Sequence, residues 1–241
     1  MDKPLIEIDI DLIDIWQVDL TAEISGMNEV VLVADELIRA DKFAFAADRQ
    51  RFIRSRSALR LILSRYLDCS AGELEFQYNE HGKPGLLFPA VKDLGFNLSH
   101  TDEVAIVAIT RNRNVGVDVN ALQRTANKKL EWRPIAKRSF SMPEQSRLFA
   151  LPDADQELMF HQVWCQKEAY TKGIGEGFRY GFQEFTVVVD LAGSRIGLIA
   201  DEKNPGFVDD WHLTRIDVGP DLMVVLAYDG SPVEQVRQWV L

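Results

Sequence analysis

The stretch Trp164-Cys165-Gln166-Lys167-Glu168-Ala169-Tyr170-Thr171-Lys172-Gly173 decides how the rest of the chain is interpreted. A period of 3.6 residues predicts a helix over about 153–172, with Trp164, Glu168 and Thr171 on one apolar face. Burying a carboxylate there costs several kcal/mol unless it is paired, binds a metal or faces a ligand. The alternative is an exposed Glu168–Lys172 pair, which stabilises a helix by about 0.2–0.5 kcal/mol. The segment alone leaves both alternatives open.

Composition restricts the class of protein. The 241 residues, with 46% hydrophobic and 27% charged side chains, are typical of a soluble globular protein of one large domain or two smaller ones. No apolar run approaches the roughly 20 residues that span a bilayer, and the acidic N-terminus does not resemble a signal peptide. We therefore expect a cytoplasmic protein that does not bind membranes. The net charge of −10 argues against nucleic-acid binding.

Two basic segments stand out in this acidic chain. One runs from Arg49 to Arg65, and the other from Lys128 to Arg138. They suggest contact with a phosphorylated small molecule or an acidic partner protein. The two cysteines, Cys69 and Cys165, match no metal-ligand spacing and are predicted to be buried thiols.

The order of the predicted elements indicates an α+β fold. Helices precede antiparallel strands in both halves, which predicts duplication of an α+β unit. We expect two similar α/β subdomains, 1–114 and 115–241, packed as a pseudo-dimer with the active site in the cleft between them. We also expect a strand at 104–110 to form a hairpin with a strand at 115–119, because Arg111-Asn112-Arg113-Asn114 has turn composition.

Asp118 and Asn120 are two residues apart on a predicted strand, so their side chains project from the same face. With a carboxylate from elsewhere they would suit Mg²⁺, which prefers hard oxygen ligands. The alternative is that both are turn residues at the end of a strand.

Two further motifs are ambiguous by themselves. Gly82-Lys83-Pro84 is typical of a hairpin turn, and Ser99-His100 is good turn chemistry that could also contact a phosphate. A Ser-His-Asp hydrolase is disfavoured, because the chain has no Gly-x-Ser-x-Gly elbow and adjacent strand residues project to opposite sides.

The combination of these motifs is more informative than any one of them. In order along the chain come a basic helix, Gly82-Lys83-Pro84, Asn97-Leu98-Ser99-His100, Gly116-Val117-Asp118-Val119-Asn120, and the Trp164–Lys172 motif. In this combination the chain, from about Arg39 to Tyr228, resembles the 4′-phosphopantetheinyl transferases of the Sfp type. Enzymes of this family transfer the phosphopantetheine arm of coenzyme A to a serine of an acyl or peptidyl carrier protein, with Mg²⁺, and release adenosine 3′,5′-bisphosphate.

The resemblance implies roles for the ionic helix and the predicted metal strand. Glu168 would ligate Mg²⁺ and help deprotonate the serine, and Lys172 would neutralise or protonate the leaving phosphate. Asp118 would be a second metal ligand and Asn120 a third. Lys167 would bind phosphate or hold Glu168.

The resemblance also implies which parts of the chain meet the two substrates. The first subdomain would bind the nucleotide of coenzyme A, and the second would carry the metal site and dock the carrier protein along Arg133–Arg138 and Gly173–Gly177. The nucleotide-binding residues would be Lys83 and Pro84 at the adenine, Ser99 and His100 at the phosphates, and one of Arg39, Arg51 and Arg60 at the 3′-phosphate.

One residue departs from the family pattern. Many relatives carry an acidic residue where this chain has Asn120, so the site has one negative charge fewer. This change leaves one other function open, a catalytically impaired protein that binds coenzyme A or a carrier. A Mg²⁺-dependent phosphohydrolase is a third alternative. Which carrier is served, in fatty-acid, polyketide or peptide synthesis, stays open too, and we expect a monomer.

Overall fold

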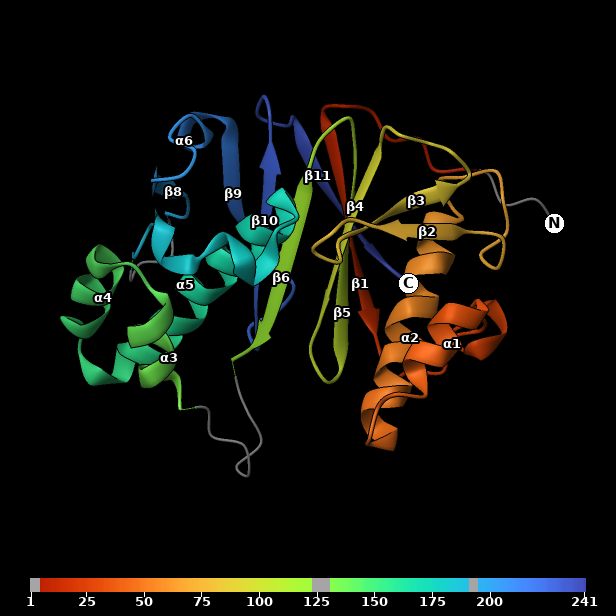
Figure 1. Cartoon of the computed structure of the whole chain (residues 1–241), viewed down its shortest axis with the longest axis horizontal. Helices are drawn as coiled ribbons and strands as arrows, with labels where there is room; N and C mark the ends of the chain where they lie inside the picture. The colour runs from red at the N-terminus through yellow and green to blue at the C-terminus, as the bar shows by residue number, and fades with distance from the viewer. Residues whose placement is uncertain (1–4, 123–130, 191–194) are drawn as a thin grey trace. The chain divides into compact units, whose positions relative to one another are not determined.

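The computed structural model describes residues 5–122, 131–190 and 195–241, and these residues form two compact units. The first unit comprises Met1–Glu80, Pro84–Asn112 and Val233–Leu241, and the second comprises His81–Lys83 and Arg113–Pro232 (Figure 1). Lys128, Lys129 and the expected start of a helix near 127 lie outside the described residues. Among the described helices, none is both long and apolar enough to cross a membrane.

The first unit is built on a four-stranded sheet in the order β11-β1-β5-β4. Its central strand β5 is an almost continuous apolar run, as expected for a strand covered on both faces. Helix α2 contributes Leu59, Ile62 and Leu63 to the core that includes Trp16 and Val107 from the sheet. The bounds in this unit are β1 Leu12–Asp19, α1 Ala34–Ala40, α2 Ala46–Leu63, β2 Glu75–Tyr78, β3 Pro84–Phe88, β4 Leu94–His100, β5 Val104–Arg111 and β11 Gln235–Val240.

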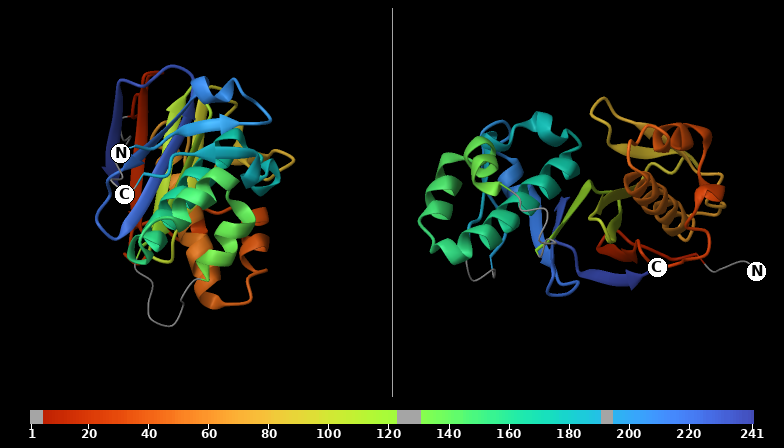
Figure 2. Two further views of the ribbon diagram at one scale, coloured as in Figure 1. Left: turned by 90° about the vertical axis from the view of Figure 1, so that its left-hand side faces the viewer. Right: turned by 90° about the horizontal axis from the view of Figure 1, so that it is seen from below.

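The second unit is built on a three-stranded antiparallel sheet in the order β6-β10-β9. The long helix α5 lies along β6 and β10, and its Phe160, Val163 and Ala169 enter the same core as Val225 and Ala227 of β10. Two further views show α3 and α4 beside α5 (Figure 2). The bounds are β6 Val115–Ala121, α3 Trp132–Ser139, α4 Met142–Phe149, α5 Asp153–Ile174, β7 Phe185–Val187, β8 Leu198–Asp201, α6 Phe207–Asp210, β9 Trp211–Ile216 and β10 Leu222–Asp229.

The two units repeat one sequence of elements. Each has a first strand, then helices, a separate two-stranded sheet (β2-β3 or β7-β8), and two final strands. In both, the last strand of the series lies in the middle: β5 lies between β1 and β4, and β10 lies between β6 and β9. The predicted α+β fold class is confirmed. The two halves are similar in topology, although their sequences show no repeat.

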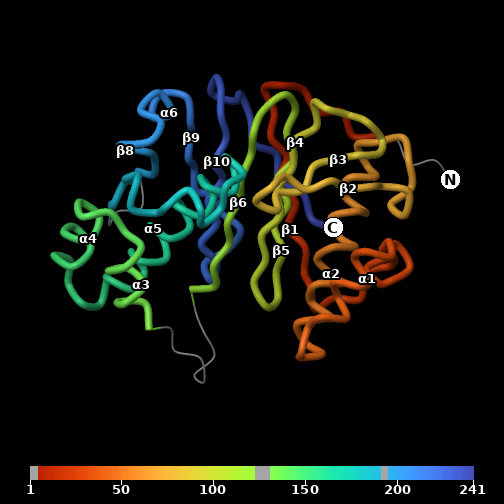
Figure 3. The backbone as a smooth tube through the Cα atoms, in the orientation of Figure 1, coloured from red at the N-terminus to blue at the C-terminus, as the bar shows by residue number. Residues whose placement is uncertain are grey.

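The predicted hairpin between residues 104–110 and 115–119 is wrong. Strand β5 pairs with β1 on one side and β4 on the other, so neither edge is left for β6, which pairs with β10 instead. The chain leaves the first unit after β5 and enters the second at β6, as the backbone trace shows (Figure 3). Turn composition indicates where the chain changes direction, but it does not determine which strands pair.

The last strand of the chain belongs to the first unit. Strand β11 runs parallel to β1, with Trp16 opposite Trp239 in the register, and the two indole rings stack at 5.4 Å. Arg237 of β11 also pairs with the buried carboxylate of Asp14, at 2.6 Å from Nε to Oδ1. The expected subdomain 115–241 places these residues in the second half, whereas the contacts place Val233–Leu241 in the first unit.

Candidate functional site

The candidate site lies where the end of α5 crosses β6. A Cβ atom on Gly116 would overlap the carbonyl oxygen of Ala169 and the amide nitrogen of Gly173, so only glycine allows this approach. Helix α5 then ends at Gly175, whose φ of 90° is the left-handed conformation that caps helices. The close crossing brings Asp118, two residues after Gly116 on the buried face of β6, beside the last turns of α5.

Gly116→Ala should therefore separate α5 from β6. Because the overlap is with backbone atoms that cannot rotate away, we expect a loss of about 3 kcal/mol in the free energy of unfolding, measured by urea denaturation. Gly206→Ala is the matched control, because a Cβ there meets nothing within 4 Å. Equal stability of the two variants would contradict the close approach.

Asp118, Glu168 and Lys172 form one charged group. Lys172 Nζ lies 2.5 Å from Asp118 Oδ1, and the exposed fractions of the two side chains are 27% and 7%. Burial raises the pKa of Glu168 to about 7; Lys172 lowers it and Asp118 raises it further. For Lys172, burial opposes the charge, but Asp118 and Glu168 outweigh it and the pKa is raised. The group thus holds two carboxylates and one ammonium in a largely buried place.

Asn120 and Cys165 lie against the other side of Asp118. Asn120 Nδ2 is 2.9 Å from Asp118 Oδ2 and 2.9 Å from Cys165 Sγ. Cys165 is fully buried, as predicted, whereas Cys69 in the first unit is only half-buried. The Cys165 Sγ lies 3.5 Å from the carbonyl oxygen of Met223 on β10. Burial raises the pKa of the Cys165 thiol well above its usual value, so the group stays protonated at neutral pH.

Lys167 points into the core of the second unit. Its Nζ pairs with Glu144 at 2.9 Å and donates to the carbonyl oxygens of Phe182 and Phe185 at 2.6 and 2.7 Å. Neither Lys167 nor Glu144 is exposed to solvent. The Lys167 ammonium thus fixes α5 to α4 and to the segment Phe182–Phe185, which does not support the expectation that Lys167 binds phosphate or holds Glu168.

Lys83 lies at the same end of α5, within the second unit. Its Nζ donates to the carbonyl oxygen of Gly173 at 2.6 Å and to that of Val115 at 3.2 Å. Burial lowers the pKa of Lys83 to about 8, and Asp229 offsets part of this effect. The negative end of the helix dipole favours a cation here. Pro84 begins β3 in the first unit and is half-buried.

Ser99 and His100 end β4 in the first unit. Ser99 is buried and His100 is exposed, and His100 Nδ1 lies 3.2 Å from the carbonyl oxygen of Thr101. Arg51 pairs with Asp102, in the turn after His100, at 3.0 Å, and with Asp48 at 2.8 Å. The structure therefore brings Arg51 and the Ser99-His100 turn together in one unit.

Arg39 and Arg60 differ sharply in access. Arg39 is exposed on α1, and its guanidinium lies 5.4 Å from the Phe52 ring centroid. Arg60 is fully buried, with Nε 2.7 Å from Glu36 Oε2 and Nη1 donating to the carbonyl oxygens of Ala71 and Leu74. These partners make Arg60 unsuitable as a ligand for the 3′-phosphate of a bound nucleotide.

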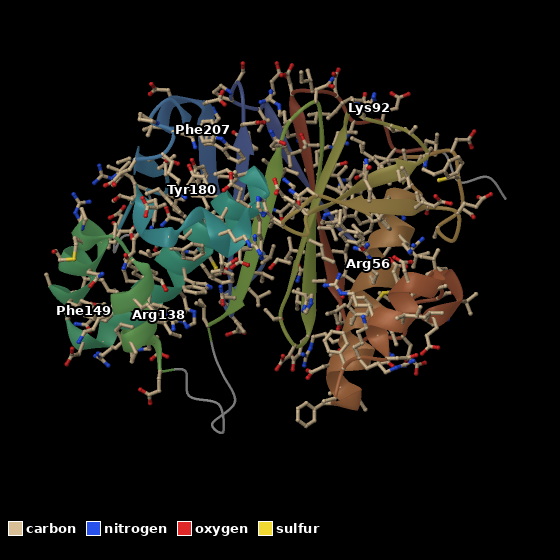
Figure 4. The ribbon with its side chains drawn as sticks, in the orientation of Figure 1. Arg56, Lys92, Arg138, Phe149, Tyr180 and Phe207 are labelled. Atoms are coloured by element: carbon tan, nitrogen blue, oxygen red, sulfur yellow. The ribbon has the colours of Figure 1, made fainter. Side chains whose placement is uncertain are left out.

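Glu36 is a residue that the sequence analysis did not single out. Its other oxygen, Oε1, pairs with Nε of Arg56 at 2.5 Å, and Arg56 also donates to the Tyr78 hydroxyl (labelled Arg56, Figure 4). A buried carboxylate between two arginines is a structural pair in most proteins. Its only signal in the sequence is an acidic residue in the first turn of α1, which is common at helix starts.

The group of Asp118, Glu168 and Lys172 supplies only some of the ligands that a divalent cation needs. In residues 5–122, 131–190 and 195–241, no group of three or more His, Cys, Asp or Glu side chains could hold a metal ion. Asp118 and Glu168 nevertheless supply two hard oxygen ligands, and burial raises the pKa of Glu168 more than the nearby Lys172 lowers it. Mg²⁺ commonly binds through one or two carboxylates plus substrate phosphates. The residues present therefore suit Mg²⁺ with a phosphorylated substrate.

Two family models match the chain, one for each half. The model of the 4′-phosphopantetheinyl transferase superfamily matches residues 114–220, and a model described as 4′-phosphopantetheinyl transferase, N-terminal, matches residues 21–112. The first match contains Asp118, Asn120, Glu168 and Lys172. The second contains the Lys83, Ser99 and His100 motifs.

Several curated proteins are similar over most of the chain. 4′-phosphopantetheinyl transferase HetI of Nostoc sp. is 36% identical over 69% of this chain and 70% of its own length. 4′-phosphopantetheinyl transferase Sfp of Bacillus subtilis is 27% identical, over 79% of this chain and 80% of its length. The L-aminoadipate-semialdehyde dehydrogenase-phosphopantetheinyl transferase of Mus musculus is 27% identical, over 70% of this chain and 56% of its own length. This chain belongs to the 4′-phosphopantetheinyl transferase superfamily. It is accordingly an enzyme of that class.

Proposed function

We propose that this enzyme transfers the 4′-phosphopantetheine arm of coenzyme A to a serine hydroxyl of an apo acyl or peptidyl carrier protein. The serine oxygen forms a bond to the phosphorus that carries the pantetheine, and the bond from that phosphorus to the bridging oxygen breaks. The hydroxyl proton goes to a base, and adenosine 3′,5′-bisphosphate leaves. The observation that carries the proposal is the buried group of Asp118, Glu168 and Lys172, because this reaction needs a base and a cation beside a pyrophosphate.

Each member of the group has a role suited to its chemistry. Glu168, whose pKa burial raises to about 7, accepts the serine proton efficiently near neutral pH. Lys172, whose pKa is raised, stays charged and stabilises the negative charge on the leaving phosphate. Asp118 and Glu168 would hold Mg²⁺. When bound, Mg²⁺ supplies positive charge to the pyrophosphate oxygens.

The first unit and Lys83 would bind the nucleotide part of coenzyme A. Lys83 and Pro84 are proposed at the adenine, and Ser99 and His100 at the phosphates. Arg39 or Arg51 is proposed at the 3′-phosphate, because a planar guanidinium suits a phosphate. Arg39 is exposed and Arg51 is partly exposed, so a ligand could reach either one. Arg60 is left out, because it is fully buried and already paired.

The carrier protein would dock on the second unit. Arg133, Lys137 and Arg138 are exposed on α3 (Arg138, Figure 4), and Arg138 lines a pocket of about 410 Å³. Its walls include Ile135, Trp164 and the exposed Phe178. Basic rim residues speed the encounter with an acidic partner, and an apolar pocket can receive one of its side chains.

The test is a mass measurement on the carrier protein. Purified apo acyl carrier protein and peptidyl carrier protein, each incubated with coenzyme A, Mg²⁺ and the full chain, should gain the mass of one phosphopantetheine arm. EDTA in excess should abolish the gain, and added Mg²⁺ should restore it. No gain with any carrier would contradict the proposed function. Release of adenosine 3′,5′-bisphosphate without a carrier would indicate a phosphohydrolase instead.

A further inference from the structure

We propose that Asn120 is a positioning residue for the Asp118 carboxylate and that Cys165 in turn fixes the Asn120 amide. This inference rests on the proposed function only in taking Asp118 as a ligand of the divalent cation. It assigns a role to the residue at which the chain departs from the acidic pattern of many relatives.

The alternation of β6 places Asn120 beside Asp118. Both side chains project from the same face of the strand, and Asn120 Nδ2 lies 2.9 Å from Asp118 Oδ2. The other carboxylate oxygen, Oδ1, lies 2.5 Å from Lys172 Nζ. Each oxygen of Asp118 therefore has a donor from a different element, which fixes the plane of the carboxylate.

The orientation of the Asn120 amide follows from its neighbours. A carboxylate oxygen accepts hydrogen bonds, so only the NH₂ end of the amide can face it. The same nitrogen lies 2.9 Å from Cys165 Sγ, which gives its second hydrogen an acceptor. The two hydrogens of the Asn120 amide nitrogen are therefore directed at Asp118 and Cys165, which sets the orientation of the amide.

Cys165, in the core of the second unit, accepts a hydrogen bond from the Asn120 amide. It is fully buried on α5, and its Sγ lies 3.5 Å from the Met223 carbonyl oxygen of β10. The contact therefore ties Asn120 to the helix that carries Glu168 and Lys172. An acidic residue at position 120 could donate to neither partner and would repel Asp118, whereas Asn120 orients Asp118 as a neutral donor.

The consequence is a pre-oriented metal ligand. Partners that orient a ligand from outside the coordination sphere are commonly worth 10–100-fold in metal affinity. Asn120→Ala should therefore weaken binding of Mn²⁺ to the purified full chain in saturating coenzyme A about tenfold, measured by the electron paramagnetic resonance signal of free Mn²⁺. Cys165→Ala should weaken it by a smaller factor, because it removes only the anchor.

A double-mutant cycle shows whether Cys165 affects metal binding through Asn120 or independently of it. If Cys165 acts through Asn120, the double variant should bind Mn²⁺ no more weakly than Asn120→Ala alone. Cys165→Ser, which keeps an acceptor, should bind more tightly than Cys165→Ala. Cys69→Ala, at the other free cysteine in the first unit, is the matched control and should leave the affinity unchanged.

The outcomes distinguish this inference from the proposed function. Urea unfolding checks that each variant is folded, and if Cys165→Ala fails to fold, the Asn120→Ala measurement decides. Unchanged Mn²⁺ affinity in Asn120→Ala, or additive losses in the double variant, would overturn the positioning role. If Asp118→Asn abolishes Mn²⁺ binding while Asn120→Ala does not weaken it, only this inference fails. If the unmodified chain binds no Mn²⁺, the proposed metal site fails with it.

Discussion

Replacing Glu168 with glutamine should lower kcat for phosphopantetheine transfer about 10³-fold. The amide keeps the shape of the side chain, but it cannot accept the serine proton and is a weaker ligand for Mg²⁺. The measurement is the rate of mass gain on an apo carrier protein at saturating coenzyme A and Mg²⁺. The unmodified chain is run in parallel.

The loss should occur without unfolding. Burial raises the pKa of Glu168 to about 7, so above that pH the folded state carries a carboxylate that would ionise more readily in the unfolded chain. Glu168→Gln at pH 8 should therefore be at least as stable to urea as the parent, and it should still bind coenzyme A without metal. Glu157→Gln, at an exposed acid on the same helix, should keep normal activity. A Glu168→Gln enzyme within tenfold of the parent would show that Glu168 is misassigned.

Replacing Lys167 with methionine should destabilise the second unit by about 3–5 kcal/mol. The variant leaves Glu144 charged, fully buried and without its cation, and it also removes the donor to the Phe182 and Phe185 carbonyl oxygens. Burial already raises the pKa of Glu144, while Lys167 lowers it, so loss of the lysine leaves only the backbone N–H groups of Ser141 and Val187 to oppose the burial penalty. The measurement is the free energy of unfolding in urea at pH 7.

Two further variants test this explanation. Lys137→Met removes an exposed lysine from α3 and should change stability by less than about 0.5 kcal/mol. Glu144→Gln combined with Lys167→Met removes both charges and should recover part of the loss, because no buried charge is left unpaired. If Lys167→Met alone costs no more than Lys137→Met, the buried pair does not hold α5 in place.

The parts of the fold that local spacing controls were predictable. Helix α5 was expected over about 153–172 and runs from Asp153 to Ile174. The inward position of its charges was also correct, since Glu168 is 9% exposed and Lys167 is fully buried. The spacing of Asp118 and Asn120 correctly placed both on one face of a strand. Their roles in catalysis remain predictions.

The partners of buried charges were not predictable, because a partner can lie anywhere in the chain. Lys167 pairs with Glu144, whose position was marked only by Ser141 three residues earlier, a helix-capping pattern. Arg60 pairs with Glu36, 24 residues away. In both cases the sequence shows a charge suited to a ligand, and only the fold shows that a second side chain already neutralises it.

The parallel strand at the end of the chain has a consequence for synthesis. The second unit, apart from His81–Lys83, is one continuous segment that ends at Pro232, so all of its residues are synthesised before β11. The first unit begins at the N-terminus, but β1 receives its neighbour β11 only when residues 235–240 emerge. The first unit is therefore the first to begin synthesis and the last to be complete. Asp14 is synthesised 223 residues before Arg237, the residue with which it forms an ion pair.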